Sequence, residues 1–125
     1  LWLREHANTA FRAQCALHLE GDLNLQALKT ALETVIERHE ILRTTFPCPA
    51  GMNVPFQVVS DPWTPLWNTI DVSRVPIKEQ GSRVREVFHE EERRPFDLEQ
   101  GPPLRLSLLT LSADSHLLLL SLPAI

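Results

Sequence analysis

Apolar and polar positions near the beginning of the chain follow two different periods. A period of two, typical of a half-buried strand, runs from residue 11 to residue 20. Its inward positions are Phe11, Ala13, Cys15, Leu17 and Leu19. After Gly21-Asp22 the apolar residues recur at the 3.6-residue spacing of an amphipathic helix; they are Leu25, Leu28, Leu32, Val35 and Ile36. We expect Asn24 to cap this helix and the helix to end near His39.

Prolines divide the middle of the chain. Residues 41–46 have the composition of a strand and are stopped by Pro47 and Pro49. Residues 56–59 have the composition of a second short strand, which we expect to form a hairpin with the first through Ala50-Gly51. Residues 61–74 are predicted to be mostly irregular, with Trp63 and Trp67 holding this loop to the core.

A second helix and two apolar strands complete the pattern. Residues 76–93 show helical spacing, with Ile77, Val84, Val87 and Phe88 on one face. Residues 104–111 and 116–122 are apolar and strand-sized, and a polar turn joins them. The order strand, helix, two strands, helix, two strands predicts an α/β fold, in the form of an α+β two-layer sandwich with helices packed on one sheet.

Composition narrows the classes of function. With 125 residues, 43% of them hydrophobic, the chain suits one globular domain with a real core. Its net charge of -4 argues against nucleic-acid binding, for which a clustered basic excess is expected. No apolar run approaches the length of a membrane span, and charged residues interrupt the apolar start, so no signal peptide is predicted. We therefore expect a cytoplasmic protein with no nucleic-acid and no membrane partner.

Residue spacing gives no catalytic, cofactor or metal motif. Cys15 and Cys48 are too few for a disulfide scaffold, and we expect Cys15 to lie in the core. The five histidines lack the spacing of metal ligands. Asp114-Ser115-His116 has the letters of a hydrolase triad, but consecutive turn residues cannot form the relay. A P-loop, a nucleophile elbow and a dinucleotide fingerprint do not occur in the sequence.

Two charged features differ in what they imply. Residues 90–94, which read EEERR, are expected to form a solvated helix end with cations near the C-terminal dipole. Arg43 lies in a predicted strand between Leu42 and Thr44. If its side of that strand is buried, a carboxylate must meet it, because an unpaired buried charge is costly. Spacing alone therefore gives Arg43 as the one candidate for a buried ion pair.

Both ends of the chain are apolar. It opens on Leu1-Trp2-Leu3 and closes on Pro123-Ala124-Ile125. Because domain ends normally lie in polar linkers, we expect residues 1–125 to be part of a larger protein, incomplete at both ends.

Residues 38–46 read RHEILRTTF and closely resemble the RHExLRTxF motif of the condensation domains of nonribosomal peptide synthetases. The resemblance runs along the chain. Leu1-Trp2-Leu3 is similar to the end of the family's opening motif, and residues 19–23 are similar to its strand–glycine–helix entry. Residues 94–105 read RPFDLEQGPPLR and resemble RPFDL…GPLLR, with Pro103 where leucine is usual.

The resemblance implies a chloramphenicol-acetyltransferase-like fold, of which residues 1–125 would form the N-terminal lobe. In such domains the last strand leads into HHxxxDG, whose second histidine is linked to attack of the acceptor amine on the donor thioester. Here Pro123 and Ala124 occupy the two histidine positions, so we expect no catalytic residue in this chain. The motif's aspartate, which pairs with an arginine in the family, would lie beyond Ile125. Three motif residues are expected to be structural: Arg38, His39 and Arg43.

Three interpretations stay open, and we favour the first. A degenerate condensation-like domain would no longer condense and would recruit a tailoring enzyme or space neighbouring domains. A working condensation domain would form an amide bond between two carrier-protein-bound substrates, with the rate supplied by positioning or by a base from the other lobe. The third interpretation is an unrelated small α/β binding domain.

The resemblance also implies partners. These are the C-terminal lobe of the same domain, carrier protein domains with their phosphopantetheine arms and, in the first interpretation, a recruited tailoring enzyme. No cofactor is expected in the lobe itself. Alone, the lobe should expose the apolar surface that faces its partner lobe and should self-associate.

Overall fold

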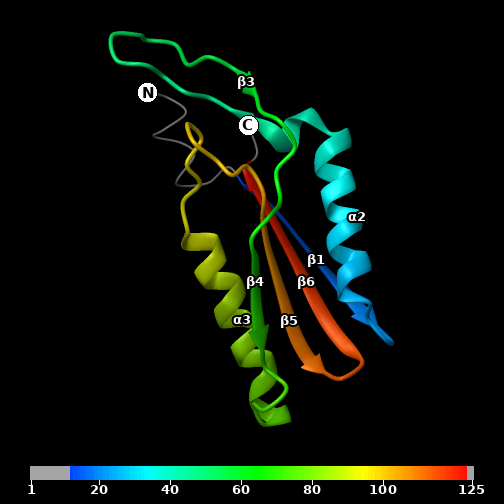
Figure 1. Cartoon of the computed structure of the whole chain (residues 1–125). Coiled ribbons are helices and arrows are strands. Elements are labelled where there is room, and N and C mark those ends of the chain that lie inside the picture. Colours follow the sequence, from blue (N-terminus) through cyan, green and yellow to red (C-terminus); the bar gives the residue numbers. More distant parts are fainter. Residues whose placement is uncertain (1–11, 124–125) are drawn as a thin grey trace.

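The computed structural model describes residues 12–123 and contains a sheet, two long helices and a protruding arm (Figure 1). Strand β1 (Arg12–Glu20) is followed by helix α2 (Leu25–Arg38), the 3₁₀ helix η1 (Glu40–Arg43) and the short strands β2 (Thr44–Thr45) and β3 (Val58–Val59). The remaining elements are β4 (Trp67–Asp71), α3 (Ile77–Arg93), β5 (Arg105–Ser112) and β6 (Ser115–Pro123).

The main sheet has four strands in the order β1-β6-β5-β4. Strand β6 pairs antiparallel with both β1 and β5, whereas β4 pairs parallel with β5. A parallel pair needs a crossover connection, which α3 supplies between the end of β4 and the start of β5. The sheet therefore places the first described strand beside the last.

Helices α2 and α3 lie on opposite faces of this sheet (Figure 1). Because side chains alternate along a strand, Leu106 and Leu108 of β5 share one face, where they pack with Ile36 of α2 in the core. Arg105 points to the other face and bonds Glu91 of α3. The expected mixed α/β fold is confirmed. The expected two-layer arrangement is wrong, because the sheet lies between the two helices and the molecule has three layers.

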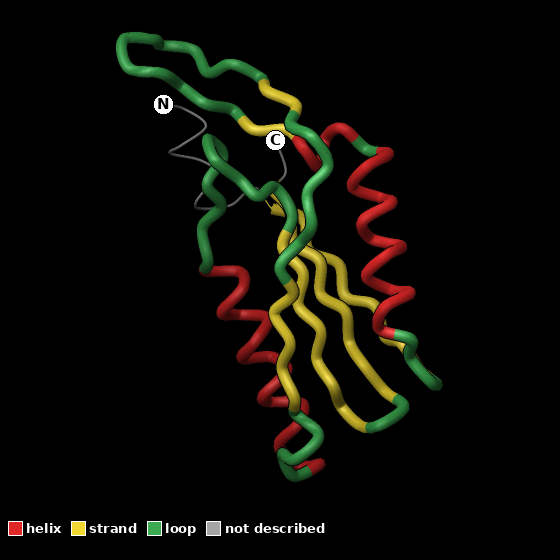
Figure 2. Tube along the Cα trace, viewed as in Figure 1, coloured by secondary structure: helices red, strands yellow, loops and turns green. Residues whose placement is uncertain are grey.

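Local signals predicted several features correctly. The Asn24 side chain accepts a hydrogen bond from the Ala27 N–H at 3.0 Å, which confirms the helix cap. Strands β2 and β3 pair antiparallel, and the arm between them turns at Ala50 and Gly51, which confirms the hairpin. Gly51 has φ +85°, a conformation that favours glycine. Figure 2 shows that most of this arm is loop.

The strand expected over residues 41–46 is wrong for its first half, because residues 40–43 form η1. The Arg43 side chain donates to the carbonyls of Ile36 and Glu37, so the chain folds back toward the end of α2 instead of extending. Only Thr44 and Thr45 enter the ladder with β3.

The irregular loop expected over residues 61–74 contains strand β4, which corrects that prediction. The strand pairs with β5 along its whole length. It has only five residues and follows a proline-rich stretch, so backbone pairing places it more than any side-chain pattern does. Trp63 and Trp67 both pack against the core, as expected, and the Trp63 Nε1–H donates to the Leu42 carbonyl at 2.9 Å.

Several side chains contradict the expected division between core and surface. On β1, three of the expected inward residues, Ala13, Cys15 and Leu17, are exposed, because the core that α2 covers is centred on β5 and β6 and β1 is an edge strand. On α2, Leu25 and Val35 of the expected apolar face are also exposed.

Ile77 is the first residue of α3 and is 87% exposed. Glu91, expected in a solvated helix end, is only 6% exposed. The buried side of α3 therefore runs through Val87 and Glu91.

Candidate functional site

One end of the sheet gathers the C-terminal ends of α2, α3 and β6 (Figure 1). Pro123, the last residue of β6, lies opposite Arg12 of β1. The Arg12 guanidinium donates to the carbonyls of Glu91 and Arg94 at the end of α3. The position at which the resemblance places HHxxxDG is therefore beside the C-terminal end of α3.

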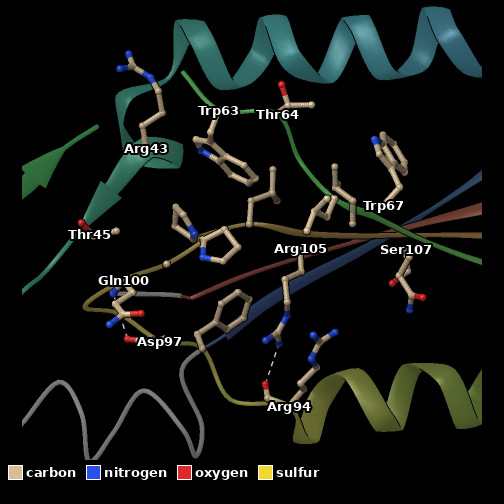
Figure 3. Close-up of a pocket in the computed structure, with 18 of the residues that line it drawn as sticks. Arg43, Thr45, Trp63, Thr64, Trp67, Arg94, Asp97, Gln100, Arg105 and Ser107 are labelled. Carbon is tan, nitrogen blue, oxygen red and sulfur yellow. Dashed lines mark hydrogen bonds between the residues drawn. The ribbon is translucent and has the colours of Figure 1, made fainter. Parts of the chain in front are cut away.

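A groove of about 950 Å³ opens at this end of the sheet (Figure 3). Its lining comes mostly from the loop before β4 and the start of β4, the first residues of β5 and the segment between α3 and β5. Arg43, Thr45 and Glu91 also line it. Its apolar surface is formed by Trp63, Leu66, Trp67, Pro95, Phe96, Pro102, Pro103, Leu104 and Leu106. Polar residues in its lining include Thr64, Asn68 and Gln100. Pro123 lies outside this lining.

Arg43 holds the C-terminal end of α2. Its Nε–H and Nη2–H donate to the carbonyls of Ile36 and Glu37 at 3.0 and 3.1 Å, and its Nη1–H donates to the Ser60 carbonyl at 2.7 Å. A cation at this position also meets the negative end of the helix dipole. Within residues 12–123 these partners are carbonyls, so the buried ion pair expected at Arg43 is not found there. Arg43 is half-buried, and that exposure removes the need for a carboxylate.

A buried ion pair lies instead between Arg105 of β5 and Glu91 of α3. The Arg105 Nε lies 2.6 Å from the Glu91 Oε1, and the two side chains are 15% and 7% exposed. Arg105 also donates to the carbonyls of Pro95 and Arg94 at 2.7 and 2.8 Å. Burial lowers the pKa of Arg105, and the Glu91 carboxylate opposes that shift. Because a guanidinium stays charged at neutral pH, the pair is ionic.

Phe96 joins the two arginines at the end of α3. The guanidinium carbons of Arg105 and Arg12 lie 3.9 and 5.1 Å from the centroid of its ring. These distances allow cation–π attraction, and the ring is only 5% exposed. The segment that resembles the family's RPFDL motif therefore contacts the arginines of β1 and β5.

The two carboxylates that line the groove both have structural partners. Glu91 bonds Arg105, and the Asp97 Oδ1 accepts the N–H groups of Glu99 and Gln100 at 3.0 and 3.1 Å. A general base must reach the proton that it abstracts. In the part of the groove that the structure describes, these carboxylates position the chain.

Arg38 and His39 end α2, and both are exposed. The His39 N–H donates to the Val35 carbonyl at 3.1 Å and so closes the helix. The structural role expected for these two side chains stays a prediction. Ala124 and Leu1-Trp2-Leu3 lie outside the described residues.

The letters of the hydrolase triad lie at the opposite end of the sheet, with Asp114 in the turn between β5 and β6 and Ser115 and His116 at the start of β6. Asp114 accepts a hydrogen bond from the Ser112 hydroxyl at 2.9 Å, whereas the Ser115 hydroxyl lies 2.8 Å from the His18 Nε2. The His116 Nδ1 is buried and has no partner among the described residues. The three side chains form no relay.

The Glu91–Arg105 pair was not predicted, although two signals in the sequence point to it. Glu91 follows Val87 by four residues, which places it on the same helix face. Arg105 interrupts an otherwise apolar run between Leu104 and Leu106. Two opposite charges on faces expected to be buried could therefore have been matched with each other.

No described helix is long and apolar enough to cross a membrane. Across residues 12–123, no group of three or more histidine, cysteine, aspartate or glutamate side chains could hold a metal ion. The groove and the two helix ends are the features that characterise this end of the molecule.

Comparison with known proteins identifies the class. The mixed α/β arrangement is the chloramphenicol-acetyltransferase-like fold of condensation domains. The family model described as Condensation domain matches residues 3–122. The chain belongs to this family, which occurs in nonribosomal peptide synthetases, as the resemblance implied.

Individual relatives agree with this assignment. The chain is 32% identical over 117 residues to the phosphinothricin tripeptide synthetase PhsC of Streptomyces viridochromogenes. The matched region covers 94% of the chain and 11% of that relative. The X-domain from teicoplanin biosynthesis has a TM-score of 0.78 at 30% identity, covering 98% of this chain and 25% of that one. The complex of the X-domain and OxyB gives a TM-score of 0.74 at 29% identity, covering 94% and 24%. The chain thus spans a quarter or less of the length of these relatives.

Proposed function

We propose that this chain is the N-terminal lobe of a condensation-like domain that no longer forms amide bonds and instead holds a tailoring enzyme or spaces neighbouring domains. The observation that carries the proposal is Pro123, followed by Ala124, at the two positions where the resemblance places histidines. The alternative is an active condensation domain that joins two carrier-protein-bound substrates.

Proline and alanine lack the chemistry of the histidines that they replace. Neither side chain accepts a proton or hydrogen-bonds an amine, and general acid–base help is worth about 10²–10⁴-fold in rate. Proline also lacks an N–H, so the end of β6 has one donor fewer. The structural partners of Glu91 and Asp97 support the proposal further, because neither carboxylate of the described groove is placed as a substitute base.

The likeness to the X-domain supports the recruiting role. That domain has been solved in a complex with OxyB, and the chain matches it at 29% identity. We therefore propose a tailoring enzyme as the partner class, beside the C-terminal lobe of the same domain and carrier proteins with phosphopantetheine arms. In this proposal the lobe binds no cofactor itself and works in the cytoplasm.

Amide formation by the full-length synthetase on two loaded carrier proteins tests the proposal, with mass spectrometry of the carrier-bound product as the measurement. We expect the unmodified domain to give no product above a synthetase from which the donor substrate is omitted. Pro123→His combined with Ala124→His should give product if only the imidazoles were lost. The matched control is Pro123→Ser with Ala124→Ser, which changes the same positions without an imidazole. Amide formation at a normal rate by the unmodified synthetase would overturn the proposal.

A binding measurement tests the recruiting role separately. We expect saturable binding between the full-length domain and the tailoring enzyme encoded with the synthetase, and we expect the histidine variant to retain it. If binding is absent, the remaining role is that of a spacer between domains.

A further inference from the structure

The two edges of the main sheet are protected to different degrees. Strand β4 is short, and Pro62 and Pro65 precede it, features that discourage pairing with another chain. Strand β1 has nine residues in unbroken register with β6, and its sequence RAQCALHLE contains no proline, glycine or lysine. Within residues 12–123, no strand pairs with the outer side of β1. A long regular edge of this kind is a template for a further strand.

The register shows which backbone groups of β1 face this edge. The Gly21 N–H donates to the Asp114 carbonyl at 2.8 Å, so residue 21 continues the hydrogen-bonded ladder. Bonded and non-bonded pairs alternate in an antiparallel ladder, so the odd-numbered residues of β1 bond to β6. The even-numbered residues turn their N–H and C=O groups outward; they are Arg12, Gln14, Ala16, His18 and Glu20.

The side chains of β1 add apolar surface to this edge. Cys15 is exposed and Leu17 is 46% exposed, and both lie on the α2 face of the sheet. The opposite face carries the polar and charged side chains of the strand. An added strand would bond the outward backbone groups, and its own side chains would contact these exposed apolar side chains.

We propose that a second copy of this chain pairs with β1 in antiparallel orientation. Ala16 lies opposite Ala16 of the other copy, and the two-fold axis passes between these two residues. In this register each copy donates five outward N–H groups and accepts five, because every even-numbered residue faces an even-numbered residue. Cys15 lies opposite Leu17 of the other copy, so apolar side chains meet. Arg12 lies opposite Glu20, so opposite charges meet at both ends of the paired strands.

The Arg12–Glu20 charge pairs and the number of paired residues of β1 favour this register over the neighbouring registers. Moving the axis to Leu17 places Gln14 opposite Glu20 and moves Arg12 beyond the last residue of the partner's β1, opposite Asp22 in the turn that follows the strand. Moving it to Cys15 places Arg12 opposite His18 and moves Glu20 beyond the first described residue of the partner's β1. The Arg12 guanidinium bonds the carbonyls of Glu91 and Arg94, which fixes its positive charge at this end of β1.

Sedimentation of the 125-residue chain tests the pairing. We expect a monomer–dimer equilibrium that Ala16→Pro weakens about tenfold or more, because proline removes an outward N–H and leaves the bonds to β6 intact. Leu17→Lys should weaken it as well, because a lysine on an exposed edge strand opposes pairing. The matched control is Ile77→Lys, which makes the same change at a residue that is 87% exposed and lies on α3. Circular dichroism verifies that each variant is folded.

Cross-linking tests the proposed register of the two β1 strands. In a Cys48→Ser chain, Cys15 is the remaining cysteine, and its copies would lie diagonally about 7–8 Å apart. A short bismaleimide should therefore join two chains through Cys15, and the Cys15→Ser chain with Cys48 intact should not be joined. A chain that stays monomeric at about 1 mM, a dimer that survives both Ala16→Pro and Leu17→Lys, or one that Ile77→Lys weakens equally would overturn the proposal.

Discussion

The C-terminal ends of the two helices are both held by an arginine, but in different surroundings. At the end of α2, the half-buried Arg43 donates to three carbonyl oxygens. At the end of α3, Arg105 also makes three hydrogen bonds, but one goes to the Glu91 carboxylate, and the two side chains are only 15% and 7% exposed. Carbonyls near the surface can bind water when their arginine is removed. A buried charge that loses its partner, such as Arg105 without Glu91, cannot.

This comparison shows that the number of hydrogen bonds does not decide what an arginine contributes. Hydrogen bonds to exposed groups exchange for bonds to water at little net cost. A buried ion pair balances attraction against desolvation, so the intact pair adds little, while removal of one partner is severe. We therefore expect the end of α3 to be sensitive to single substitutions and the end of α2 to be more tolerant.

The largest effect is expected for Glu91→Leu. This substitution leaves the Arg105 guanidinium enclosed without its carboxylate and should lower the free energy of unfolding by about 3 kcal/mol. Urea denaturation of the variant and the parent chain measures the difference. The matched control is Glu90→Leu on the next residue, whose side chain is 70% exposed, and it should change stability by less than about 0.5 kcal/mol.

The double variant Glu91→Leu with Arg105→Leu separates an unpaired charge from lost packing. Because both charges are then removed, stability should return close to that of the parent. A double variant as unstable as the sum of its two single variants would show that the buried charge is not the cause.

Arg43→Met should have the second largest effect, a loss of about 1–2 kcal/mol in the free energy of unfolding. The methionine keeps an apolar stem and leaves the carbonyls of Glu37 and Ser60 to water, while the carbonyl of the buried Ile36 loses its partner. The control is Arg38→Met, because Arg38 is an exposed cation in the last turn of the same helix. The expected difference between the ends of the two helices is contradicted if Arg43→Met costs as much as Glu91→Leu in the same urea titration.

The same two helix ends show how far the sequence predicts this molecule. Helical spacing and the Asn24 cap predicted α2 closely, since these signals are local. The end of α2 was missed because the Arg43 side chain reaches back along the chain and turns residues 40–43 into η1. Hydrophobic pattern alone carries no information about that contact.

Long-range pairing explains the remaining differences. Strand β4 is placed by its bonds to β5, which lies more than thirty residues later, and no feature of its own five residues specifies that partner. Glu91 reads as one of three consecutive glutamates, and only the side of α3 that packs on the sheet distinguishes it. At the candidate site, the family motif and the Pro123 substitution were visible in the sequence, but the Arg12–Phe96–Arg105 cluster required three segments to meet.

Phe96→Leu should have the smallest effect, because leucine keeps an apolar side chain at a site that is only 5% exposed. The expected loss is about 1 kcal/mol, divided between reduced packing and the lost attraction of the ring for the two guanidiniums. The same substitution in the Glu91→Leu, Arg105→Leu chain isolates the second contribution, since Arg105, the closer cation, is then absent. In that chain the loss of unfolding free energy caused by Phe96→Leu should fall by about half. If the loss of unfolding free energy is unchanged, Phe96 contributes only through packing in the core. The end of α3 would then differ from the end of α2 only in its buried carboxylate.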